Sequence, residues 1–160
     1  MDTKVEPTVI HNTFVIERSY PYSVEKVFAA FAEPDKKRRW YGEGRSHDLE
    51  KFEMDFRVGG GEHIQYRFKE GTPFPGVALT NDGSYHDIVT NQRIVTASTM
   101  AMAGRRFSTS LVTIEFLPTD KGTDLVCTHQ GAFFEGSDGP GMREAGWRKL
   151  FDQLDSELAR

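Results

Sequence analysis

The sequence has 160 residues, of which 38% are hydrophobic and 28% charged, as in a folded chain of one domain's length. A formal net charge of -4 argues against a nucleic-acid-binding module, which usually presents a basic face. The longest uncharged stretch near a strand pattern, residues 94–104, is shorter than the roughly 20 residues of a membrane-spanning helix. The single cysteine, Cys127, excludes an internal disulfide and a cysteine-based zinc cluster.

A strand and two short helices are predicted first along the chain. Residues 11–20 alternate between apolar and polar side chains, which indicates a strand. Ser23 follows and can cap a helix whose apolar side chains recur at helical spacing. Pro34 breaks that helix and is well placed to begin a second short one, which runs to about Trp40.

Six strands and a long helix are predicted next. Their period of two indicates strands over residues 52–58, 64–68, 83–89, 93–102, 106–117 and 123–130. The Gly59-Gly60-Gly61 run predicts a tight turn after the first of these, and Asp138 can cap a C-terminal helix that has Pro140 in its first turn. Consecutive strands with short connections indicate an antiparallel sheet, and the amphipathic helix can cover one face of it. The sequence therefore predicts an α+β fold.

Five segments, in their order along the chain, resemble one known family: SYPYSVEKVFAAFAEPDKKRRWY, FEMDFRVGGGEHIQYRF, GSYHDIVTNQRIVTAST, GTDLVCTHQGAFF and GWRKLFDQL. Over residues 10–159 the sequence is similar to the Hsp90-ATPase-activator-homologue-like (AHSA1-like) branch of the START/Bet v 1-like (SRPBCC) superfamily. The resemblance implies a helix-grip fold, in which a curved seven-stranded antiparallel sheet wraps around the long C-terminal helix. It also implies a cavity between sheet and helix that holds an apolar small molecule.

The organisation of the whole chain is predicted from its ends and from the resemblance. We expect a single START/Bet v 1-like domain over residues 1–160, with residues 1–9 as a flexible N-terminal segment. That segment has no apolar core of a secretory signal, so we expect a cytoplasmic protein. The eukaryotic activators carry an additional N-terminal domain, which we expect to be absent here. A homodimer is left open.

The predicted C-terminal helix carries three candidate ligand-binding residues. Gly146 lies in mid-helix, where glycine costs about 1 kcal/mol relative to alanine. Its missing side chain either lets the helix pack closely on the sheet or leaves room for a ligand. Met142 lies four residues earlier and suits irregular apolar ligands, although it could equally be a core residue. Trp147 begins the apolar stripe of the helix and fits a core position or a cavity wall.

Charged and polar strand residues are the next candidates. Arg18 shares the alternation phase of the inward side chains of its strand, and a buried arginine needs a carboxylate or a ligand anion. Alternation places Tyr85 and Asp87 on one face and His86 on the other, without showing which face is inward. If Asp87 faces inward, it is a natural partner for Arg18 or a polar anchor for a substrate. The alternative is that Arg18 is exposed at the strand end.

The remaining candidates for ligand binding are Trp40, Tyr66, Ser110, His129 and Phe133. His129 shares an apolar phase of its strand and is either a core histidine or, with Asp87, a candidate for acid–base chemistry, because imidazole titrates near neutral pH. Ser110 could supply a polar contact within an apolar cavity. Trp40 suits a pocket mouth, where an amphipathic ring is favourable.

Metal and cofactor chemistry have no support in the sequence. The five histidines show no HExxH or comparable metal-ligand spacing, so no metal site is predicted. Gly59-Gly60-Gly61 lacks the lysine and hydroxyl residue of a phosphate loop, and no cofactor is expected.

Three functions remain open. The leading one is binding of a small hydrophobic or amphipathic molecule in an internal cavity, with a few polar side chains orienting it. The second is a cyclase, dehydratase or hydrolase of a ring compound in the same cavity. The third is a chaperone accessory or other protein-binding module, which would use Trp40, Tyr41 and the basic residues 36–39 before them. The fold alone does not choose among them.

Overall fold

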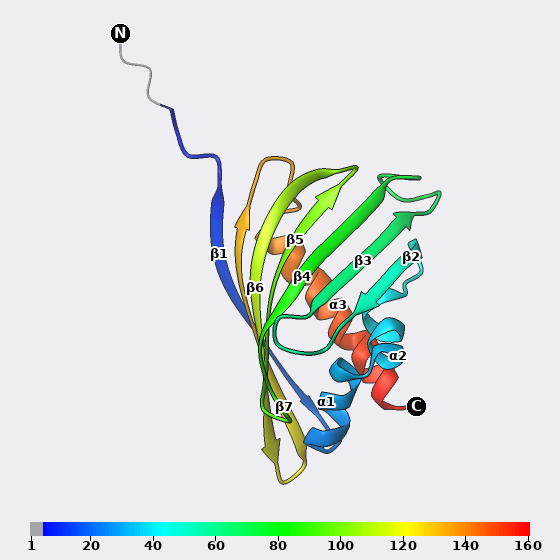
Figure 1. Cartoon of the computed structure of the whole chain (residues 1–160), viewed down its shortest axis with the longest axis vertical. Helices are drawn as coiled ribbons and strands as arrows, with labels where there is room; N and C mark the ends of the chain where they lie inside the picture. Colours follow the sequence, from blue (N-terminus) through cyan, green and yellow to red (C-terminus); the bar gives the residue numbers. More distant parts are fainter. Residues whose placement is uncertain (1–4) are drawn as a thin grey trace.

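The computed structural model describes residues 5–160 (Figure 1). In chain order the elements are β1 (Ile10–Tyr20), α1 (Val24–Ala32), α2 (Pro34–Lys37), the π-helix η1 (Arg38–Gly42), β2 (His47–Met54), β3 (Gly61–Phe68), β4 (Ala78–Val89), β5 (Arg93–Met102), β6 (Arg105–Thr119), β7 (Gly122–Phe133) and α3 (Pro140–Leu158). Residues 1–4 of the predicted N-terminal segment lie outside the described residues, and residues 5–9 form no helix or strand.

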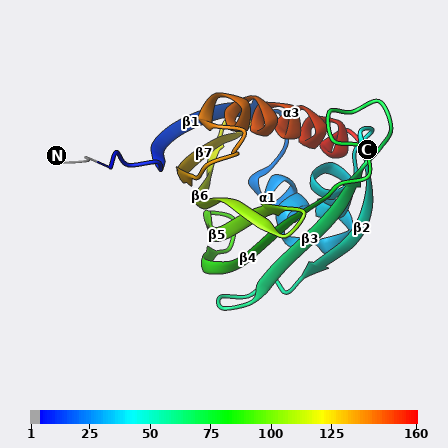
Figure 2. The same ribbon diagram turned by 90° about the horizontal axis from the view of Figure 1, so that it is seen from above.

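The seven strands form one antiparallel sheet in the order β1-β7-β6-β5-β4-β3-β2. The first strand pairs with the last one, so α1, α2 and η1 carry the chain across from one sheet edge to the other. The sheet is curved, and α3 lies along its concave side (Figures 1 and 2). The predicted helix-grip architecture is therefore confirmed.

Two strands begin five residues earlier than the sequence predicts. β2 begins at His47 rather than residue 52, because a bulge between Leu49 and Lys51 breaks the alternation that marks a strand. The strand ends at Met54. The turn that follows needs glycine at position 60, because a Cβ there would lie 2.0 Å from the backbone oxygen of Asp55. β4 begins at Ala78 rather than at residue 83. In the segment before residue 83 the inward-facing residues are not all apolar, so the sequence shows no clear alternation there.

A second bulge changes which residues of β4 share a face. The register shifts between Tyr85 and Asp87, so the two residues do not share a face as simple alternation requires. Tyr85 is buried, whereas Asp87 lies at the surface and pairs with Arg93 at 2.7 Å. Asp87 therefore does not face inward, and the pair with Arg18 that an inward Asp87 would allow does not form. The Arg18 guanidinium reaches α3 instead and donates to Asp152 Oδ1 at 2.8 Å.

The start of α3 also differs from the prediction. Its N-cap is Gly139, which supplies no side-chain hydrogen bond, and Pro140 occupies the first turn. The Asp138 carboxylate does not cap the helix and instead accepts hydrogen bonds from Arg143 one turn into it. A side chain that normally serves as a local cap is thus used to hold a buried charge.

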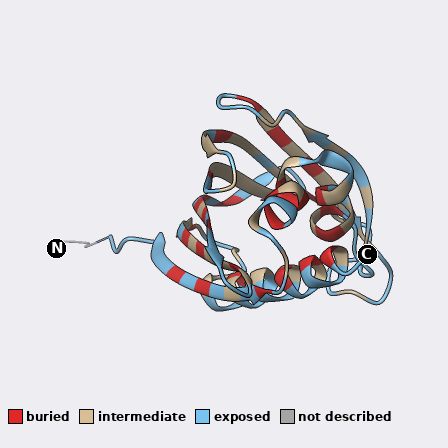
Figure 3. Ribbon diagram, turned by 90° about the horizontal axis from the view of Figure 1, so that it is seen from below, coloured by how far each residue is buried: buried red, intermediate tan, exposed pale blue. Residues whose placement is uncertain are grey.

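The hydrophobic core fills only part of the concave side. Edge-to-face pairs of Phe28 and Phe31 with Phe116, each with ring centroids 5.2 Å apart, join α1 to the sheet. The C-terminal half of α3 adds Phe151, Leu154 and Leu158, all buried. Buried residues face inward between these elements (Figure 3). The core is therefore concentrated around α1 and the second half of α3.

We expect Leu154→Ala to destabilise the protein by about 3 kcal/mol, because it leaves a cavity where α3 packs on the core. Urea unfolding followed by circular dichroism would measure this change in free energy. The matched control is Leu117→Ala in β6, whose side chain is 47% exposed and should cost less than about 0.5 kcal/mol. Equal losses in the two variants would contradict the position assigned to the core.

Candidate functional site

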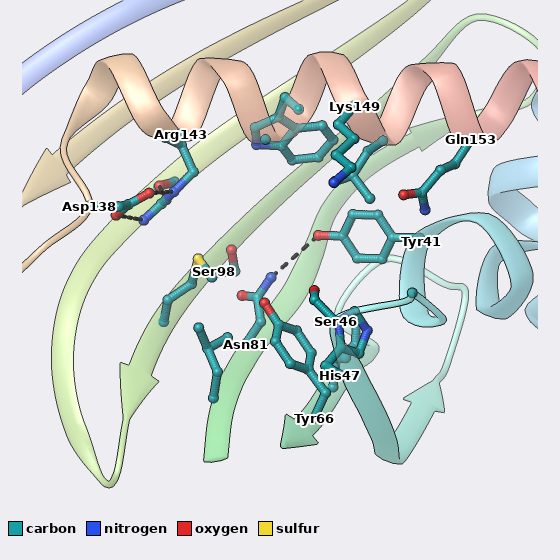
Figure 4. Close-up of a pocket in the computed structure, with 18 of the residues that line it drawn as sticks. Tyr41, Ser46, His47, Tyr66, Asn81, Ser98, Asp138, Arg143, Lys149 and Gln153 are labelled. Atoms are coloured by element: carbon teal, nitrogen blue, oxygen red, sulfur yellow. Dashed lines mark hydrogen bonds and ion pairs between the residues drawn. The ribbon is translucent and has the colours of Figure 1, made fainter. Parts of the chain in front are cut away.

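A pocket of about 1830 Å³ lies where the core stops, between the concave face of the sheet, α3 and η1. Figure 4 shows α3 along one side of this pocket and side chains from η1 and the strands facing it. Its wall is mostly apolar and aromatic. The main apolar and aromatic lining residues are Trp40, Tyr41, Ile64, Tyr66, Leu79, Met100, Met102, Val112, Trp147 and Leu150.

Arg143 is the principal charge at one end of the pocket. Its guanidinium makes a bidentate pair with Asp138, Nε and Nη2 each donating to one carboxylate oxygen at 2.9 Å. Nη2 also donates to Ser108 Oγ at 2.8 Å, and Nη1 approaches Ser110 Oγ at 3.4 Å. The cation lies 5.1 Å from the centre of the Phe133 ring. This buried arginine is therefore paired, and the pair ties α3 to β6.

His129 lies at the same end of the pocket and is only 1% exposed. Its ring stacks on Phe14 with centroids 4.5 Å apart, and Gly131 leaves room beside it, since a Cβ there would lie 2.9 Å from the ring. The Nδ1 atom has no hydrogen-bond partner among residues 5–160. Burial, together with the charge of Arg143, lowers the pKa of His129 to about 4. The imidazole is therefore neutral at pH 7.

Tyr41 and Asn81 form the other polar end. Asn81 Nδ2 donates to the Tyr41 hydroxyl at 3.3 Å, while Asn81 Oδ1 is buried without a partner in the described part of the chain (Figure 4). Tyr66 lies beside them and stacks on His47 with ring centroids 4.0 Å apart. Burial raises the pKa of Tyr41 and of Tyr66 above the usual range, so both hydroxyls stay protonated.

A buried ion pair fixes the element that carries Tyr41. Lys37 Nζ lies 2.6 Å from Glu62 Oε2, and the Tyr85 hydroxyl donates to the same carboxylate oxygen. The Lys37 ammonium also lies 4.7 Å from the centre of the Tyr41 ring. At the other side of η1, Gln153 Nε2 donates to the Trp40 carbonyl at 2.7 Å. The position of Tyr41 is thus set by contacts to β3 and to α3.

Comparison with known proteins agrees with this architecture. The family model for "Activator of Hsp90 ATPase homolog 1-like protein" matches residues 21–159. The chain belongs to this AHSA1-like family. A comparison with curated proteins gives no match.

Solved AHSA1-like relatives share the fold closely. The chain is 44% identical to the Mll3558 protein from Rhizobium loti, with a TM-score of 0.83 over 94% of this chain and 99% of that one. It is 33% identical to a protein from Rhizobium leguminosarum, also with a TM-score of 0.83, over 95% and 97% of the two chains. An AHSA1-like protein from Aeromonas hydrophila shares the fold at 21% identity, with a TM-score of 0.69 over 92% of each chain.

Seven of the residues predicted from the sequence of this AHSA1-like protein line the pocket: Trp40, Tyr66, Ser110, His129, Met142, Gly146 and Trp147. Gly146 leaves open space, because a Cβ placed there would meet no atom within 4 Å. Close packing of helix on sheet therefore does not explain this glycine. Met142 lies at the rim, 70% exposed. Trp40 is buried, and its indole N–H donates to the Ala30 carbonyl at 2.8 Å.

Four predicted residues do not line the pocket: Arg18, Tyr85, Asp87 and Phe133. Arg18 contacts α3, and Asp87 pairs with Arg93 at the surface, as described above. Phe133 packs under Arg143, and Tyr85 hydrogen-bonds Glu62, so these two residues support the pocket from behind.

Sequence reasoning missed Arg143, Asn81 and the pairing of Lys37. Arg143 lies four residues before Trp147, on the helix face that carries the apolar stripe. A charged residue on that face is visible in the sequence and could have been recognised as a buried polar candidate. Asn81 similarly follows the inward phase of Leu79. Lys37 belongs to a run of four basic residues, and nothing in that run marks the one that is buried.

Neither a membrane-spanning helix nor a metal-binding cluster is found in the described residues. Over residues 5–160 no helix is long and apolar enough to cross a membrane. The same residues contain no group of three or more His, Cys, Asp or Glu side chains that could hold a metal ion.

We expect Glu62→Gln to destabilise the protein by about 3 kcal/mol, because it leaves the Lys37 ammonium buried without a counter-charge. Chemical unfolding at pH 7 would measure the loss, and Lys37→Met combined with Glu62→Gln should recover part of it. Glu53→Gln is the control, since Glu53 is an exposed partner of Lys51 and should change stability little. Equal effects of Glu62→Gln and Glu53→Gln would contradict the buried pair.

Stability should depend on pH through His129. The pKa of His129 in the folded state lies below the unfolded value of 6.5. Between these two values the unfolded state binds a proton that the folded state does not bind. The contribution of neutral His129 to the free energy of unfolding is therefore complete above pH 6.5 and is lost as the pH falls toward about 4. We expect a loss of about 2 kcal/mol, allowing for solvent in the adjacent pocket. Unfolding at pH 7 and pH 4.5 should show a smaller difference in His129→Phe than in the parent, while the exposed control His11→Asn should match the parent.

Proposed function

We propose that this AHSA1-like protein binds a small amphipathic molecule in the pocket between its sheet and α3. The observation that carries this proposal is the pocket itself, in which an apolar wall is combined with a few polar groups at separated positions. Such a combination is typical of small-molecule sites, where apolar burial supplies affinity and polar groups fix orientation. The open space beside Gly146 supports it, because a mid-helix glycine that packs against nothing has no structural benefit.

The acid–base alternative has less support from the site. A general base works best when its pKa lies near the working pH, and a pKa of about 4 makes His129 a weak base at neutral pH. Asp87, the other predicted catalytic candidate, pairs with Arg93 away from the pocket. The arrangement therefore favours noncovalent binding over an enzyme that uses these two residues.

A chaperone accessory is the function that the family name suggests. Three of the residues expected to form such a surface are engaged within the protein. Trp40 is buried, Lys37 pairs with Glu62, and Arg39 makes a bidentate contact with Glu157 at 2.7 and 2.8 Å. This region supports the pocket wall better than it would support a docking surface.

We expect Gly146→Leu to reduce binding of Nile red, an uncharged fluorescent dye, at least about tenfold, because the new side chain would occupy the pocket. Fluorescence titration would measure the dissociation constant. Thermal unfolding should show no loss of stability, since leucine is the better helix former.

Gly141→Leu is the matched control. Gly141 lies in the same helix and also faces open space, but it does not line the pocket. This variant should bind the dye as the parent does. Equal binding by the parent and by both variants would contradict a ligand site in this pocket.

A further inference from the structure

The main polar groups of the pocket lie at its two ends. They differ from an ion-binding site because each buried charge already has a partner. At one end, Arg143 is neutralised by Asp138 through two hydrogen bonds. Burial alone would favour a protonated Asp138, but the hydrogen bonds and charge of Arg143 outweigh it and keep the pKa of this carboxyl low. The pair therefore stays ionised and nearly neutral overall, and His129 beside it is uncharged.

The other end carries hydroxyls and an amide. The Lys37 charge behind it is already paired with Glu62 at 2.6 Å. The pocket is also lined by Arg45, Arg105 and Lys149, but these three cations are exposed, whereas the two buried cations, Arg143 and Lys37, are both paired. A ligand anion buried at either end would therefore meet a cation that is already neutralised and would lie near its carboxylate. Burial of a charge without a partner is strongly unfavourable, so this pocket discriminates against ions.

Both ends keep hydrogen-bond donors in reserve. Arg143 Nη1 carries two N–H groups, and its one contact within residues 5–160 is the long 3.4 Å approach to Ser110 Oγ. The Tyr41 hydroxyl accepts from Asn81 at 3.3 Å, which leaves its own proton free to donate. A ligand oxygen that accepts a hydrogen bond would satisfy each of these donors.

The register of the sheet sets the distance between the two ends. Ser110 lies opposite Ser98 on β5, and Ser98 lies opposite Gly83 on β4, two residues from Asn81. Two strand spacings sideways and two residues along a strand place the Ser110 and Asn81 backbones about 12 Å apart. Ser98 lies between them in the register and lines the pocket. Figure 4 shows Ser98 between Arg143 and Asn81. A ligand that reaches both ends must therefore be elongated.

We propose that the ligand is an uncharged, elongated apolar molecule that carries a hydrogen-bond-accepting oxygen at each end, one bound near Arg143 and one near Tyr41. The inference rests on the proposed function and specifies its ligand class. Apolar wall residues between the ends, such as Met100, Val112 and Trp147, contact the body of the molecule. Specificity comes from the two acceptors and from the exclusion of charge.

Three naphthalenes of similar size test this ligand class. Methyl 6-methoxy-2-naphthoate is uncharged with an acceptor at each end, 6-methoxy-2-naphthoate is its carboxylate, and 2,6-dimethylnaphthalene lacks oxygen. Competition against Nile red at pH 7 should show the ester binding at least about tenfold more tightly than the carboxylate, and about fivefold more tightly than the hydrocarbon. Equal or tighter binding of the carboxylate by the parent protein would overturn the inference.

Asp138→Asn provides a specificity switch. It removes the carboxylate that neutralises Arg143 and leaves a free guanidinium, so the preference for ester over carboxylate should fall about tenfold or reverse. Asp120→Asn makes the same change of net charge in the exposed β6–β7 turn, outside the pocket, and should leave the preference unchanged. An unchanged preference in a folded Asp138→Asn protein would overturn the role of the ion pair.

Tyr41→Phe tests the second end. It should weaken the ester about fivefold and leave 2,6-dimethylnaphthalene unchanged, because only the ester uses the hydroxyl. Equal weakening of both compounds would show a loss of shape and contradict the second acceptor site. The failures are distinguishable. Suppose that Nile red and the hydrocarbon bind, that Gly146→Leu blocks them, and that the ester is not preferred. The proposed ligand class is then wrong, while the proposed function stands. If none of the probes binds, the proposed function falls too.

Discussion

The pocket depends on how α3 is held against the sheet. Its C-terminal half is fixed by apolar packing of Phe151 and Leu154, and by the Tyr20 hydroxyl, which donates to the Phe151 carbonyl at 3.0 Å. In its N-terminal half Arg143 is the buried residue, and there the Arg143–Asp138 pair with its serine contacts spans the space to β6. A paired arginine is long enough to hold the helix at a distance that apolar side chains would close. The fold therefore keeps a hollow at one end of an otherwise filled interior.

The filling of the other end follows from the short helices. The aromatic rings of α1 occupy the concave face where β1, β6 and β7 meet, and η1 ends this filled region with Trp40 and Tyr41. Tyr41 sits at the boundary and contacts both regions, since its ring packs on Trp40 and approaches Trp147. Because Lys37 and Gln153 fix this boundary from two sides, the pocket wall is preorganised. Binding of the proposed ligand would then need little ordering of the protein.

The sequence predicted the fold better than the site, for physical reasons. Apolar periodicity reports which side chains face inward, so the antiparallel sheet and the long helix were readable. A bulge adds one residue and reverses the phase, which is why Asp87 was expected beside Tyr85. Asp138 was assigned to a helix cap because aspartate is common there, yet its partner was the buried Arg143. Pairings between distant residues such as Lys37 and Glu62 depend on register, and no local pattern carries that information.

The arrangement of charge also explains why so polar an interior is compatible with the proposed binding of an apolar molecule. Arg143 and Lys37 are each buried with a carboxylate partner, and His129 is held neutral, so a ligand in the pocket is presented with dipoles rather than net charge. Oriented dipoles in a low-dielectric wall interact strongly with a ligand hydroxyl or carbonyl and give no compensation for a buried ion. For the proposed ligand, an apolar wall with unpaired donors at its ends would select by the positions of hydrogen-bonding atoms as well as by shape. The buried ion pairs therefore serve two purposes at once: they hold the pocket open, and they keep its interior uncharged.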